Sequence, residues 1–153
     1  MKNIKMNTNT FTFLIVLGAV VSLSLHFLPQ ISFAQMTDIE LKEPAMGGEE
    51  YNGATKGTLD ITDRNGTITL TAKMFDPPAG EDVYEGWLED KGGSGYHLSV
   101  GEFDESNTLT VNQTMVNPYT YTIFYVTAEP ADDVDPNPSD IVVGTQLPSP
   151  FGQ

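Results

Sequence analysis

The residues best suited to bind a ligand form an acidic stretch, Asp132–Asp140, near the end of the sequence. Carboxylate and amide oxygens are the hard ligands that calcium prefers. Alternating acids and an amide imitate the start of an EF-hand loop, but Pro138 stands where that loop requires glycine. We therefore expect either solvated turn residues or a looser calcium site, which would use Asp132, Asp133, Asp135 and Asp140.

Side chains that could support catalysis do not form a catalytic pattern. Acidic pairs such as Glu81-Asp82, Glu89-Asp90 and Asp104-Glu105 are plentiful. Neighbours on a strand point to opposite faces, however, and a glycosidase needs two carboxylates fixed across a cleft. His97 is the only histidine after the N-terminal segment, and we interpret it as an exposed edge residue. The sequence has no cysteine, which excludes thiolate zinc sites, thiol redox chemistry and iron–sulfur clusters. We expect no catalytic residues and no cofactor other than the calcium considered above.

Two asparagines match the acceptor pattern for N-glycosylation. Asn65 begins Asn-Gly-Thr and Asn112 begins Asn-Gln-Thr. Asn65 is expected on a turn and Asn112 on the outer face of a strand. Both are therefore glycosylation candidates if the protein is exported.

The N-terminal segment has the three parts of a secretory signal. Lys2 and Lys5 precede an apolar run over residues 11–28, and Ser32-Phe33-Ala34 puts small residues where signal peptidase reads them. We predict a signal peptide over 1–34, cleaved before Gln35. The alternative is an uncleaved N-terminal anchor at 11–28. Either reading makes the protein exported, whether secreted or held at the cell surface.

The charge of the chain restricts its partners. Its formal net charge is −14, from 21 acidic and 7 basic residues, and all the acids follow the apolar run. Nucleic acid and anionic lipids would be repelled. We expect no nucleic acid partner, and contact with the membrane only through the N-terminal segment. The expected partner is an envelope or extracellular protein whose identity the sequence does not give.

Alternating apolar and polar residues predict strands rather than helices. In residues 67–74 the side chains of Ile68, Leu70, Ala72 and Met74 share one face, and Asn65-Gly66 joins this strand to a preceding one as a hairpin. Further strands are expected at 83–89, 96–103, 109–115, 119–128 and 141–144, with a bulge at Gly101. Over residues 57–147 we predict an all-β fold, a seven-stranded antiparallel β-sandwich of immunoglobulin-like architecture without a disulfide.

The remaining segments are expected to lie outside this domain. Residues 35–56 are predicted to be a flexible acidic linker, and residues 148–153 a disordered tail. Within the domain, Trp87 lies on the third predicted strand and is expected to be buried in the core. The alternation of Tyr119, Tyr121 and Tyr125 predicts that they share one face, where core packing is favoured over a stripe that binds sugar or peptide.

Several short segments resemble the extracytoplasmic domain of anti-sigma-K factors. Residues 84–90 are similar to its Tyr-x-x-Trp-Leu segment, residues 98–103 to its Leu-Gly-x-Phe segment, residues 126–130 to its Val-Thr-x-Glu-Pro segment, and residues 139–144 to its closing strand. The resemblance covers residues 57–147 in the same order. It implies a β-sandwich that senses or binds outside the membrane, and it supplies no catalytic residues.

The resemblance does not extend to the cytoplasmic domain with which those factors hold a sigma factor. Only residues 1–10 precede the apolar run, so direct sigma-factor binding is not expected of this chain. The sequence favours an exported, non-catalytic interaction or sensing module. The alternatives are an exported hydrolase that uses acidic residues and a structural component of the cell envelope.

Overall fold

The computed structural model describes residues 33–46, 50–90 and 92–148. The chain divides into two units, Met1–Ile31 and Ser32–Gln153, and every described residue belongs to the second. The predicted signal segment therefore lies outside the described residues except for Phe33 and Ala34, and so does the predicted tail except for Pro148. Within the described ranges no helix is long and apolar enough to span a membrane.

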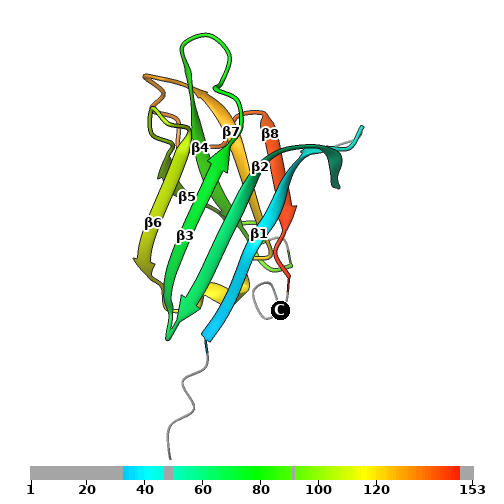
Figure 1. Cartoon of the computed structure of the whole chain (residues 1–153). Coiled ribbons are helices and arrows are strands. Elements are labelled where there is room, and N and C mark those ends of the chain that lie inside the picture. Colours follow the sequence, from blue (N-terminus) through cyan, green and yellow to red (C-terminus); the bar gives the residue numbers. More distant parts are fainter. Residues whose placement is uncertain (1–32, 47–49, 91, 149–153) are drawn as a thin grey trace, which may run out of the picture. The chain divides into compact units, whose positions relative to one another are not determined.

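Eight strands of the described residues form one antiparallel sheet in the order β5-β4-β7-β8-β1-β2-β3-β6. Figure 1 shows β6, β3, β2 and β1 side by side in front of the other four. The prediction of an all-β antiparallel fold is confirmed. A short 3-10 helix, Pro118–Thr120, precedes β7. The strands are β1 (Phe33–Pro44), β2 (Tyr51–Arg64), β3 (Thr67–Met74), β4 (Asp82–Glu89), β5 (His97–Glu102), β6 (Thr108–Thr114), β7 (Ile123–Pro130) and β8 (Ile141–Gln146).

The hairpin between β2 and β3 forms as its local sequence predicts. Arg64 pairs with Thr67, so that Asn65 and Gly66 alone make the turn. Both have positive φ, 55° and 81°, as a two-residue turn of this type requires. The apolar face of β3 is buried along its whole length. The pairing of β2 with β3 runs without a register shift.

The prediction of a flexible linker over 35–56 is corrected for the described residues of that segment, 35–46 and 50–56. They form most of β1 and the start of β2. The alternation is broken at Asp38, which has a φ of 56° and donates its backbone N–H to the Asp60 carboxylate at 2.8 Å. This bulge moves the inward positions to Met36 and Ile39, both of which pack against the core. With β1 included, the described sheet has eight strands rather than seven.

The main core lies on one face of these strands. Its largest fully buried members include Phe124 and Leu88 from β7 and β4, and Leu59, Ile61 and Leu70 from β2 and β3. Because β7 has large side chains on both faces, its other face must be covered by something else. That second face carries the candidate site.

Candidate functional site

A second apolar cluster lies apart from the main core, on the opposite face of β4 and β7. It contains Trp87, Ile123 and Tyr125, all of them buried. Trp87 pairs with Tyr125 across the two strands, and their rings stack with centroids 6.4 Å apart. The burial predicted for Trp87 is confirmed, but its packing belongs to this cluster and not to the main core.

Tyr51 covers the cluster from the start of β2. An added methyl group at Gly144 of β8 would lie 2.5 Å from the Tyr51 ring, so the ring rests directly on the backbone there. Only glycine permits so close an approach. Gly144 pairs with Tyr125 in the sheet, and the three aromatic rings of Tyr51, Tyr125 and Trp87 therefore form a row that crosses β8, β7 and β4.

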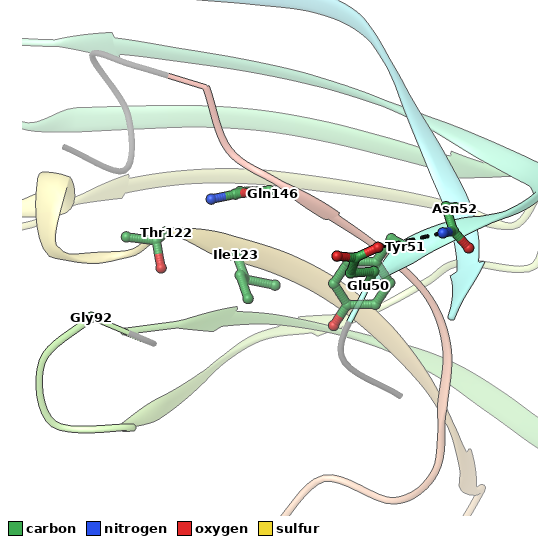
Figure 2. A pocket seen from close by; sticks show the side chains of 7 residues that line it. All are labelled: Glu50, Tyr51, Asn52, Gly92, Thr122, Ile123 and Gln146. Carbon is green, nitrogen blue, oxygen red and sulfur yellow. Dashed lines mark hydrogen bonds between the residues drawn. The ribbon is translucent and has the colours of Figure 1, made fainter. Parts of the chain in front are cut away.

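An open pocket of about 540 Å³ lies beside this row. Figure 2 shows Ile123 between Thr122 on one side and Tyr51 with Glu50 on the other. Gln146, which pairs with Ile123, also lines the pocket. The remaining lining residues are Asn52 and Gly92. Volumes on the order of 300–1,000 Å³ are typical of ligand sites.

The chemistry of the pocket follows from these side chains. Ile123 and the Tyr51 ring offer apolar surface, while the amides of Asn52 and Gln146 can each donate and accept hydrogen bonds. Among the described residues that line it, Glu50 is the only charged one, and it accepts a long hydrogen bond from Asn52 at 3.5 Å. The pocket therefore suits a neutral or cationic ligand that has both an apolar surface and several polar groups.

The hydroxyls of the two tyrosines in the row stay protonated at neutral pH. Burial raises the pKa of Tyr51 to about 12, and the charge of Glu89 adds to this. Burial also raises the pKa of Tyr125, whose hydroxyl lies 2.8 Å from Nδ1 of His97. His97 is exposed on β5, at one end of the sheet order, as predicted. Its tyrosine partner could not be predicted, because the two residues lie on different strands.

Behind the row, a chain of buried polar groups fixes Trp87. Its indole N–H donates to the hydroxyl of Thr127 at 2.9 Å. Thr127 in turn is hydrogen-bonded to the carboxylate of Glu129, which also accepts the backbone N–H of Ser139 at 2.9 Å and the Ser139 hydroxyl. No buried side-chain nitrogen or oxygen among the described residues lacks a partner. This network holds Trp87, and with it one end of the aromatic row, in a fixed position.

Glu85 and Glu129 are the pair that comes nearest to an acid–base couple. Burial raises the pKa of Glu85, and the negative charge of Glu129 adds to this against the hydrogen bond from Ser99. Burial would also raise the pKa of Glu129, but the hydrogen bonds from Ser139 and Thr127 outweigh it and lower the pKa. Because Ser139 occupies both oxygens of the buried Glu129, this carboxylate is not placed to exchange a proton with a substrate.

The opposite pKa shifts predict opposite effects of pH on stability. The lowered pKa of Glu129 stabilises the fold above its ordinary value of 4.5, and this contribution is lost as the pH falls through the folded-state pKa. The raised pKa of Glu85 contributes stability at low pH that is lost as the pH rises through its folded-state value. In urea unfolding between about pH 3 and pH 7, Glu129→Gln should flatten the acid limb, whereas Glu85→Gln should raise stability at pH 7 relative to the parent protein. Parallel curves for the two variants would contradict this assignment.

The acidic loop does not assemble the predicted calcium site. The described residues contain no group of three or more His, Asp or Glu side chains arranged to hold a metal ion. Instead, Asp133 accepts the N–H of Asp135 at 2.8 Å, and Asp135 accepts the N–H of Asn137 at 3.1 Å. These carboxylates cap their own turns. Calcium at Asp132, Asp133, Asp135 and Asp140 stays a prediction without support from this geometry.

The glycosylation candidates are both accessible. Asn65 is exposed at the tip of the β2–β3 hairpin, and Asn112 is exposed on β6. Asn65 follows β2 at the end opposite Tyr51 and Asn52, and none of the residues that line the pocket belongs to β6. Their modification stays a prediction.

The prediction for the three tyrosines is wrong, because β7 begins only at Ile123. Tyr119 lies in the 3-10 helix and donates its hydroxyl to the buried Asp63. Tyr121 packs against the main core, and Tyr125 alone belongs to the second cluster. Sequence reasoning also missed Tyr51, which it placed in a linker. A glycine within the apolar run of β8 was the one available signal of a close approach at Gly144.

Comparisons with known proteins add no relative to this description. No protein-family model matches the chain, and neither the curated proteins nor the solved structures contain a significant match.

Proposed function

We propose that this protein is an exported, non-catalytic interaction or sensing module that holds a partner in the pocket beside Tyr51. The observation that supports this is the aromatic row on the outer face of β4, β7 and β8, next to an open pocket lined by Ile123, the Tyr51 ring and two side-chain amides. Ligand pockets are typically lined by apolar and aromatic side chains together with a few polar groups. The partner would be an envelope or extracellular protein.

The resemblance to the outer domain of anti-sigma-K factors is part of this proposal. The proposal also includes a two-layer sandwich, in which β6-β3-β2-β1 pack on β8-β7-β4-β5. The observation that favours two layers is that β1 and β8 share a single register pair, Lys42 with Gly144. The pocket then lies on the outer surface of the second layer, where a partner can reach it.

Retention of an envelope partner tests the proposed function. The full chain would be immobilised and exposed to solubilised envelope from its source organism. We expect the double variant Asn52→Ala/Gln146→Ala to lose the partner, because both amides line the pocket and both are exposed, so the fold should be kept. The matched control is Asn112→Ala/Gln35→Ala, which removes the same groups from exposed positions elsewhere. Equal retention by both double variants, or retention of nothing by the parent, would refute the pocket's role.

A further inference from the structure

The sheet comes close to closing on itself between its two end strands. β5 and β6 stand at opposite ends of the strand order, yet they contact each other. At the end next to the connecting loop, Leu109 of β6 and Val100 of β5 both lie against Gly86. Within the described part of the chain no ladder pair joins the two strands. We call the unpaired edges of β5 and β6, with the side chains between them, the β5–β6 seam.

Apolar side chains of the core become accessible at the other end of the seam. Leu98 of β5 and Met115, just after β6, are only partly buried although they pack against the main core. Tyr96 is 57% exposed and Val116 is fully exposed. Gln113 shares the inward face of β6 with two buried residues, yet it is exposed. The main core is therefore closed where Val100 and Leu109 meet, and partly accessible to solvent at the end where Leu98 and Met115 lie.

The β6 edge lacks the features that usually prevent strand pairing. Natural edge strands are protected by charged residues, prolines, bulges or a covering segment. The sequence of β6 is Thr-Leu-Thr-Val-Asn-Gln-Thr, which contains no charged residue, proline or glycine. Charged residues are otherwise frequent in the chain, which has 28 of them among 153 residues. Its pairing with β3 is regular over seven consecutive residues. Such an edge is a template for one more strand.

We propose that the β5–β6 seam binds an extended segment of a partner protein, which adds a strand to the β6 edge. Unpaired backbone groups on a strand edge are matched by another extended backbone. Alternate side chains of that segment would be apolar, because they would face Leu98 and Met115. The side chains facing solvent would be neutral or basic, since the chain has a net charge of −14. This site is separate from the pocket of the proposed function.

A designed peptide tests the proposal on the full chain. The probe is the labelled heptapeptide Lys-Val-Thr-Val-Lys-Val-Thr, and its control has N-methyl groups on alternate backbone amides. We expect the probe to slow hydrogen exchange at alternate amides of β6, measured by NMR, and the N-methylated peptide to have no effect. Equal effects of the two peptides, or no change at any β6 amide, would overturn the proposal.

Two variants decide where the peptide binds. Gln113→Lys places the residue type that guards natural edges at the mouth of the seam and should weaken binding by about tenfold or more. Thr69→Lys makes the same charge change at an exposed position of β3 and should leave affinity within about twofold. The pocket variant Asn52→Ala/Gln146→Ala should bind the probe normally, so failure of one proposal is distinguishable from failure of the other. A dimer of the unliganded chain that already protects the β6 amides would assign the seam to a second copy and overturn the partner segment.

Discussion

Replacing Phe124 by alanine is expected to lower the free energy of unfolding by about 3–5 kcal/mol. The side chain is completely buried in the main core. An added methyl group at Gly86 would lie 3.3 Å from the tip of its ring, so the ring fills space above a residue that has no side chain of its own. Gly86 has no side chain that could move into the cavity, so we expect the loss of stability to lie toward the upper end of that range.

The effect would be large relative to the whole stability of the protein. Domains of this size are typically stable by only about 5–15 kcal/mol, and this chain has no cysteine with which to add a disulfide. Urea unfolding followed by circular dichroism measures the loss. The matched control is Phe75→Ala, because Phe75 is 56% exposed in the loop after β3 and its loss should cost less than about 1 kcal/mol. Similar costs for the two variants would contradict the position of Phe124 in the core.

Features set by neighbouring residues could be predicted from the sequence. The β2–β3 hairpin follows from Asn65-Gly66 between two alternating runs, and the register confirms it. The bulge at Gly101 is also confirmed, by a register shift opposite Gly86 and a φ of 119°. In both cases a few consecutive residues determine the backbone conformation. Short-range signals of this kind are sufficient for single strands and turns.

Features set by distant residues could not be predicted in this way. β1 was missed because its bulge at Asp38 breaks period two, and because what completes it is pairing with β2 on one side and β8 on the other. The candidate site has the same origin. Tyr51 and Gly144 are adjacent only because β2 and β8 both flank β1 in the sheet order. No pattern within either segment indicates that contact.

The alternation of residues along β4 indicates the face on which Trp87 lies. Tyr84 and Leu88 share one face with Gly86, and Trp87 must therefore point to the other. A tryptophan facing away from the main core needs its own cover and a partner for its indole N–H. In this fold the cover comes from Tyr125 of β7, Tyr51 of β2 and Ile141 of β8, and the partner is Thr127. Removing the hydroxyl of Thr127 should have the second large effect that we expect.

Thr127→Val should destabilise the fold by about 1–3 kcal/mol although it preserves the shape of the side chain. Thr127 is completely buried, and valine would leave the indole N–H of Trp87 without its acceptor at 2.9 Å. It would also remove a hydrogen bond from the buried carboxylate of Glu129. Because Trp87 is the only tryptophan, its fluorescence reports the change directly, and we expect emission at shorter wavelength.

Two further variants separate the hydrogen bond from the packing. Thr127→Ser keeps the hydroxyl and should restore the emission of the parent protein, while it loses only the stability of one buried methyl group, about 1 kcal/mol. Thr69→Val makes the same substitution at an exposed position of β3 and should change stability by less than about 0.5 kcal/mol. If Thr127→Val were as mild as Thr69→Val, the polar chain behind Trp87 would not hold the aromatic row in place. The row and the pocket beside it would then depend on packing alone, and the rigid support that we assign to the row would be wrong.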